Sequence, residues 1–251
     1  MSQVLQVYTT TVYYFIKIFK ILNSICQSTK YFLKQHIGKW KYLTFWNLWI
    51  QLIFFIISLL NNVFGSHSIE PDSSRTKLQK IRDYIFATLA FPIGQFVGIV
   101  FWTLWAIDRE LVLPQKVDTW FPTYINHMMH TIVIPAQLLE LCLLNHIYPK
   151  RIVGMASSII FFLVYIIWIL VVKYAGGIWV YPILSKLDVD PKLASTISIP
   201  LMAFLIGCSL IGGLLYVLGE LLNYLFWKKI RKTITKKSQK SSIYKMNEKS
   251  V

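Results

Sequence analysis

Residues 43–64 read LTFWNLWIQLIFFIISLLNNVF and contain no charged side chain. An α-helix needs about 20 mainly apolar residues to cross the ~30 Å hydrocarbon core of a bilayer. Further stretches of this kind lie near 84–107, 123–145, 152–173 and 196–226, and a weaker, lysine-containing one lies near 4–26. The weaker stretch either spans the membrane or lies in its interface as an amphipathic helix. The sequence therefore predicts an all-α, polytopic membrane helical bundle over residues 1–227, with six transmembrane helices.

The composition agrees with a membrane protein. Of the 251 residues, 55% are hydrophobic, which exceeds the ~45–50% that is usual in soluble domains. Three widely separated cysteines give neither a disulfide framework nor zinc-ligand spacing. The sequence also lacks a nucleotide fingerprint, a phosphate loop, the nucleophile elbow of α/β-hydrolases and the zinc-protease helix motif. Any enzymatic chemistry must therefore use another set of residues, and no cofactor or metal is expected.

Basic residues give the chain a net charge of +15 and gather in the last segment, 228–251, where Glu248 is the only acidic residue. By the positive-inside rule this segment faces the cytosol, and six spans then place both termini there. We expect a disordered basic tail that is attracted to anionic lipid rather than to nucleic acid. The predicted location is a multi-pass position in an endomembrane such as the ER, or in the plasma membrane.

A polar stripe runs along the 123–145 stretch. Asn126, His130, Gln137 and Glu140 follow at intervals of 4, 7 and 3 residues, so they share one face of a helix. Polar side chains at membrane depth usually face the interior of a bundle. Pro135 removes one backbone donor and predicts a kink. The stripe has two explanations: a functional site, or interhelical hydrogen bonds, which average ~0.6 kcal/mol in membranes.

Thr44 opens the 43–64 stretch. A threonine at a helix start is a preferred N-cap, worth ~1 kcal/mol, and a cap is its simplest explanation. In the six-span arrangement, however, the loops 27–42 and 108–122 lie on the same, non-cytosolic side. His130 then lies ~10 Å into a helix that is entered from the surface where Thr44 begins its own. The two side chains can share a leaflet, and they meet if their helices are neighbours with suitable rotation.

A threonine beside a histidine offers a nucleophile and a base. The hydroxyl is a weak nucleophile until a base removes its proton, and neutral histidine is the usual base near pH 7. Ester cleavage would pass through an acyl-threonine, with His130 returning its proton to the leaving alcohol. Asn126 and His127 are candidate donors to the oxyanion, a contribution of ~3 kcal/mol. Glu140 lies ~15 Å further along the helix, too far to orient His130.

Short motifs recur in order over about residues 38–227: KYLTF at 41–45, AFP at 90–92, FW at 101–102, DRE at 108–110, NH at 126–127 with HT at 130–131, WVYP at 179–182 and GE at 219–220. In these motifs the chain closely resembles the androgen-induced protein family. The resemblance implies a multi-pass threonine hydrolase that cleaves fatty acid esters of hydroxy fatty acids. It implies Thr44 as the nucleophile and His130 as the essential histidine. Met128 and Met129 add bulk where relatives often have a smaller residue, which affects the substrate pocket rather than the proposed pair.

An amphiphilic lipid ester also suits the position of Thr44. Burial of acyl chains is favourable by ~0.8 kcal/mol per CH₂, so such a substrate partitions into the bilayer and can enter between helices. Its carbonyl would rest near the polar boundary, where Thr44 begins its helix.

Other classes of protein remain open from the residues alone. A transporter or channel would use the stripe from Asn126 to Glu140 as a polar path with His130 as a proton relay, although the halves of the chain show no symmetry. A non-enzymatic membrane scaffold would use Thr44 as a cap and the stripe for packing. A metal site at His127, His130 and Glu140 has a carboxylate that is too distant and no further ligand.

Overall fold

Helices make up the described part of the chain. The computed structural model describes residues 38–66, 75–119, 121–188 and 198–248, with side chains in the last range up to residue 228. Six residues of the first 37 are also described, and all of them are helical: Thr9, Val12, Tyr13, Ile16, Lys17 and Lys20. The expected span at 4–26 therefore lies mostly outside the described residues.

Four helices are long and apolar enough to cross a membrane. They are α3 (Leu43–Phe64), the continuous helix formed by α4 (Lys77–Ile85), η2 (Phe86–Ala90) and α5 (Phe91–Ile107), α8 (Arg151–Gly176) and the first part of α10 (Ile199–Glu248). The shorter elements are η1 (Gly38–Lys41), η3 (Arg109–Leu111), η4 (Gln115–Thr119), α6 (Thr123–His130), α7 (Val133–Leu143) and α9 (Pro182–Leu187). The predicted class, an all-α membrane bundle, is confirmed, with four of the six expected spans described as long helices.

The expected span at 123–145 is divided into two helices. The break falls at Thr131 and Ile132, between α6 and α7. Its cause is Pro135, because a proline ring clashes with the carbonyl of the residue four positions earlier, which is Thr131. The kink that the sequence predicts is thus a full interruption, and neither half alone has the length of a span.

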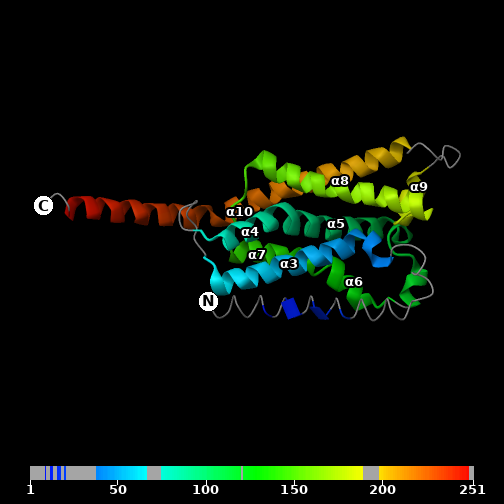
Figure 1. The fold of residues 1–251 in the computed structure, drawn as a ribbon, viewed down its shortest axis with the longest axis horizontal. Coiled ribbons are helices and arrows are strands. Elements are labelled where there is room, and N and C mark those ends of the chain that lie inside the picture. The colour runs from blue at the N-terminus through cyan, green and yellow to red at the C-terminus, as the bar shows by residue number, and fades with distance from the viewer. Residues whose placement is uncertain are drawn as a thin grey trace.

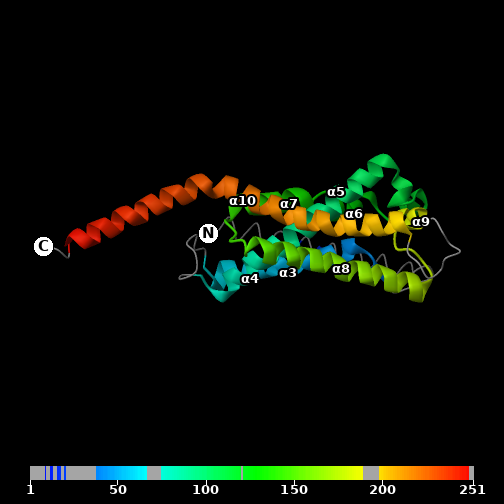
Figure 2. The ribbon, with the colours of Figure 1, turned by 90° about the horizontal axis from the view of Figure 1, so that it is seen from above.

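α5 lies in the centre of the bundle. It contacts α3, α6, α7 and α10, and in Figure 1 it runs between the α8 and α10 pair and the layer that holds α3 and α7. The view from above, in Figure 2, separates α10 from α8 and places α3 on the side of α8. The outer helices α8 and α10 expose large apolar side chains such as Ile167 and Leu214, as expected of surfaces that face lipid.

Two glycines let the neighbouring helices approach α5 closely. A Cβ added to Gly94 would lie 2.9 Å from Nε2 of Gln51 on α3 and 3.0 Å from Cγ2 of Val133 on α7. A Cβ on Gly98 would lie 2.7 Å from the carbonyl oxygen of His130. Small residues four apart are a usual means of close helix approach in membranes, and here they bring α3 and the end of α6 against the same helix.

A π-helical turn, η2, interrupts the helix that carries α4 and α5. Pro92 has no amide hydrogen and cannot bond the carbonyl of Thr88, four residues earlier, so the turn widens at that position. The hydroxyl of Ser158 on α8 donates to that carbonyl at 2.7 Å. The hydroxyl thereby replaces the missing helical hydrogen bond and fixes α8 against the wide turn.

The basic segment from residue 228 begins as a continuation of α10, and its expected disorder stays a prediction. α10 continues as a helix to Glu248 and projects from one end of the bundle (Figure 1). The reason is in the sequence, since residues 228–248 contain neither proline nor glycine and are rich in lysine, a good helix former.

Candidate functional site

Thr44 is the second residue of α3 and does not cap it. The N-cap is Tyr42, whose side chain makes no capping hydrogen bond. The hydroxyl oxygen of Tyr181 performs this role by accepting the amide of Leu43 at 3.0 Å. The capping explanation of Thr44 is therefore wrong, and its half-buried side chain instead lies within hydrogen-bonding reach of Tyr181.

Two tyrosines hold the entry to α3 in place. Tyr165 on α8 donates its hydroxyl to the carbonyl of Lys41 at 2.8 Å and lies 3.3 Å from the hydroxyl of Tyr181. Burial raises the pKa of Tyr181, which keeps this phenol protonated at neutral pH. Sequence reasoning had placed Tyr181 only within a family motif, and its position beside Thr44 emerges from the structure.

The first backbone amides of α3 differ in whether they have a hydrogen-bond acceptor. Leu43 donates to Tyr181, while Phe45 and Trp46 donate to the carbonyl of Tyr42 at 3.1 and 3.4 Å. In the described part of the chain the Thr44 amide has no acceptor, as is common in the first turn of a helix. This amide sits at the positive end of the helix dipole, next to the Thr44 hydroxyl, where it can donate to a developing oxyanion.

His130 ends α6 and is buried, with 7% of its surface exposed. Its ring stacks on Phe101 at a centroid distance of 3.7 Å, and it hydrogen-bonds to the backbone of Val97. Nδ1 is buried and has no hydrogen-bond partner among the described residues. In the neutral tautomer that carries its proton on Nε2, this nitrogen keeps a lone pair and can accept a proton.

The helices of Thr44 and His130 are in register. α3 and the α6 to α7 segment start at the same end of the bundle and run in the same direction (Figure 1), and Gln137 donates to Oε1 of Gln51 between them. Thr44 precedes Gln51 by 7 residues, about two turns of α3, and His130 precedes Gln137 by 7 residues across the break between α6 and α7. The two predicted residues therefore lie toward the same end of neighbouring elements.

Contacts of α6 support this register beyond the break. Met128 packs against Phe45 and Leu48 of α3, so α6 remains beside the first turns of α3. In the described ranges no hydrogen bond joins Thr44 to His130, because the hydroxyl is directed to Tyr181 and the imidazole to the backbone of α5. Catalytic hydrogen bonds often form only when substrate is bound.

All four members of the polar stripe are buried, as the sequence predicts. The helix break divides the stripe into an α6 half and an α7 half, which differ in their hydrogen bonding. Gln137 is bonded to Gln51, and Oε1 of Glu140 lies 3.4 Å from Nε2 of His146. On α6, by contrast, Oδ1 of Asn126 is buried without a partner in the described ranges, one turn before His130. The α7 half is tied to α3 and to His146, although Oε1 of Gln137 also has no partner in the described ranges, and the α6 half presents the unpartnered Oδ1 of Asn126 and Nδ1 of His130.

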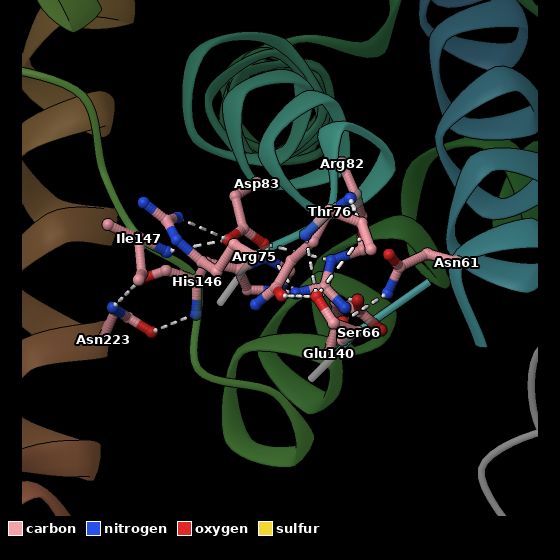
Figure 3. Close-up of polar contacts among 11 residues, drawn as sticks. Asn61, Ser66, Arg75, Thr76, Arg82, Asp83, Glu140, His146, Ile147 and Asn223 are labelled. Atoms are coloured by element: carbon pink, nitrogen blue, oxygen red, sulfur yellow. Dashed lines mark hydrogen bonds and ion pairs between the residues drawn. The ribbon is translucent and has the colours of Figure 1, made fainter. Parts of the chain in front are cut away.

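A second polar cluster lies at the opposite end of α3, and sequence reasoning missed it (Figure 3). Its centre is Asp83 on α4. The carboxylate accepts from Arg82 at 2.6 Å, lies 3.1 Å from Nδ1 of His146, and accepts the amide of Ile147 at 3.3 Å. Asn223 on α10 exchanges two hydrogen bonds with the His146 backbone. The cluster ties α4, α7, α10 and the segment 144–150 together.

This cluster is a structural tie rather than a second reaction centre. Its charged groups are almost wholly buried and already paired, and the His146 ring lies between two carboxylates and stacks on Phe86. Within the described ranges no three His, Cys, Asp or Glu side chains are placed to hold a metal ion. The only sequence signal was an Arg–Asp pair at the border of a span.

Comparisons with known proteins agree with this membrane architecture. Residues 3–224 match the family described as FAR-17a/AIG1-like protein. The chain is 37% identical to the androgen-induced gene 1 protein of Homo sapiens over 195 residues, which cover 76% of this chain and 78% of that protein. It is 36% identical to the androgen-dependent TFPI-regulating protein of Mus musculus over 205 residues, covering 80% and 83%. No solved structure matches the chain.

Proposed function

Because the chain belongs to the FAR-17a/AIG1-like protein family, we propose that it is a membrane hydrolase of fatty acid esters of hydroxy fatty acids. Thr44 is its nucleophile and His130 its base, and it acts in the ER or the plasma membrane. The proposal uses no metal or cofactor.

One observation carries this proposal: Nδ1 of His130 is buried and unpartnered. Leaving a buried polar atom without a partner costs about 1–3 kcal/mol, so packing alone gives no reason to keep it. In the neutral tautomer with its proton on Nε2, this nitrogen is a proton acceptor. Because α6 lies beside the first turns of α3, we assign Thr44 as the hydroxyl whose proton Nδ1 of His130 accepts.

The reaction proceeds by two acyl transfers. The Thr44 oxygen attacks the ester carbonyl while its proton passes to Nδ1 of His130, and the Thr44 amide donates to the oxyanion. The bond between the carbonyl carbon and the alcohol oxygen breaks, and His130 protonates the departing hydroxy fatty acid. Water then attacks the acyl-threonine and gives a proton to His130, the bond between the carbonyl carbon and the Thr44 oxygen breaks, and His130 returns the proton to this oxygen as the fatty acid leaves.

The location suits an amphiphilic ester. Thr44 lies at the start of a membrane-length helix, so a carbonyl at the polar boundary reaches it while the acyl chains remain among apolar side chains. The Thr44 hydroxyl lies within hydrogen-bonding reach of Tyr181, and a substrate that displaces this contact would free the nucleophile.

The test uses the full chain in detergent or nanodiscs with a fatty acid ester of a hydroxy fatty acid. We expect wild-type hydrolysis, and a loss of at least a hundredfold in Thr44→Ala and in His130→Ala, in line with the usual effect of removing a nucleophile or base. Thr44→Ser should retain activity, since it keeps the hydroxyl. A covalent serine-hydrolase probe should label wild type and fail on Thr44→Ala.

Full hydrolysis by a folded Thr44→Ala variant would exclude this nucleophile. Absence of hydrolysis by wild type, together with proton-coupled solute flux in liposomes that His130→Ala abolishes, would favour the transporter alternative. If neither activity is found, the scaffold alternative remains. Thermal unfolding of each variant in detergent checks that the substitutions leave the bundle intact.

A further inference from the structure

Lys41 is a buried lysine with no acidic partner among the described residues. It ends η1, three residues before Thr44, and only 8% of its surface is exposed. Its ammonium lies 5.3 Å from the centre of the Tyr42 ring, and in the described ranges it forms no ion pair. Burial lowers the pKa of this ammonium. An uncompensated buried charge is costly, so the site favours a bound anion.

The acidic groups of the connecting segments at this end are already engaged elsewhere. Asp108 pairs with Lys186 at 3.3 Å and Asp118 with Arg109 at 2.8 Å. Asp188 lies 3.9 Å from Lys173. None of these described carboxylates pairs with Lys41.

The surroundings of Lys41 are rich in positive potential. The N-terminus of α3 follows it by two residues, and the Thr44 amide there has no acceptor in the described part of the chain. The Lys41 carbonyl, which could attract a cation, is occupied by Tyr165. Tyr42 lies between Lys41 and the region of Thr44, because its ring packs edge-on against Tyr181, the neighbour of Thr44.

We propose that Lys41 binds the free carboxylate of the substrate and thereby selects esters of hydroxy acids over neutral esters. This inference rests on the proposed hydrolysis at Thr44. A fatty acid ester of a hydroxy fatty acid carries one scissile ester and one carboxylate, and a cation near the nucleophile distinguishes it from a triacylglycerol or a sterol ester. An anion on Lys41 also removes the penalty of its buried charge.

The experiment compares two substrates that differ only at the carboxyl group, the free acid and its primary amide. In Lys41→Met, which keeps the apolar stem, KM for the acid should rise about tenfold or more, with kcat and the kinetics of the amide little changed. Lys41→Arg should keep the preference for the acid. Lys39→Met, two residues earlier and half-buried, removes a neighbouring lysine and should leave the preference unaltered.

A binding measurement separates this inference from the proposed reaction. Ether-linked analogues of the acid and the amide cannot be hydrolysed, and their affinities are measured for wild type and Lys41→Met. Preferential binding of the acid analogue that Lys41→Met removes supports the inference even if Thr44→Ala keeps full activity. Equal effects of Lys41→Met on both analogues, or none on either, overturn it and leave Lys41 as an interfacial anchor.

Discussion

Gln137 on α7 donates a hydrogen bond to Oε1 of Gln51 on α3, and both side chains are fully buried. Gln51 passes the connection on by donating to Oδ1 of Asn47 and to the carbonyl of Ala90, each at 2.9 Å. This chain of amides joins α3, η2 and α7 in the interior. It fixes α7, the helix that follows His130, against α3, the helix that carries Thr44.

Replacing Gln137 by leucine should therefore weaken both stability and hydrolysis. The change leaves Oε1 of Gln51 buried without a donor, at a cost of about 1–3 kcal/mol, and loosens the register between α3 and α7. Chemical unfolding in mixed detergent measures the first effect and ester hydrolysis the second. Gln115→Leu, on an exposed turn, should change the free energy of unfolding by less than about 0.5 kcal/mol. Equal effects of the two substitutions would contradict the role given to Gln137.

Gly98→Ala should displace the end of α6. The added Cβ would lie 2.7 Å from the His130 carbonyl oxygen and 2.6 Å from Ile134, and overpacking of this kind costs about 1–3 kcal/mol. Because the backbone that carries the proposed base must move, the rate of hydrolysis by the folded variant should fall, in addition to the loss of folding free energy. Gly207→Ala has no atom within 4 Å of its added Cβ and should be neutral or stabilising by about 0.5–1 kcal/mol. Normal kcat in a folded Gly98→Ala variant would show that this close approach is not needed.

Asp83→Asn should be among the most destabilising single substitutions. It removes a carboxylate that is 1% exposed and leaves the nearby arginine without its anion, and breaking a buried ion pair in this way costs about 3–5 kcal/mol. Asp118→Asn breaks a pair that is open to solvent and should cost at most about 1 kcal/mol. The comparison is made by thermal unfolding in detergent. A small effect at Asp83 would mean that the cluster does not hold these helices together.

Ser158→Ala should cost about 1–3 kcal/mol, because it leaves the Thr88 carbonyl without a donor. In a Pro92→Ala background the amide of residue 92 becomes available to that carbonyl, so the same substitution should cost clearly less. A double-mutant cycle on unfolding free energies measures the difference. Additive effects would show that Pro92 is not the cause of the π turn.

The sequence predicts the membrane class, the positions of the four long helices and the buried face of the polar stripe, because these follow from hydropathy and helical period. It predicts a kink at Pro135, although the extent of the break at Thr131 depends on how α6 packs against α3 and α5. The assignments of Thr44 and His130 remain predictions. What the structure adds to them is that their helices lie side by side and that the imidazole is buried with Nδ1 unpartnered among the described residues.

Other features of the structure cannot be predicted from local sequence patterns. The cluster around Asp83 combines residues from separate segments, including His146 and Asn223, whose proximity depends on tertiary packing. The role of Tyr181 at the start of α3 has the same origin, since its hydroxyl caps a helix 138 positions earlier in the chain. The helical course of residues 228–248 does not follow from charge alone, because lysine-rich segments without glycine or proline suit a helix as well as a solvated tail.

The adjacency of Arg82 and Asp83 has a consequence for biogenesis. A nascent chain exposes α4 to the translocon before His146 and Asn223 have been synthesised, so the carboxylate must enter its helix without most of its final partners. The neighbouring guanidinium supplies two hydrogen bonds from the preceding residue, and the pair is neutral as a unit. The helix can therefore be inserted before the rest of the cluster is assembled around it.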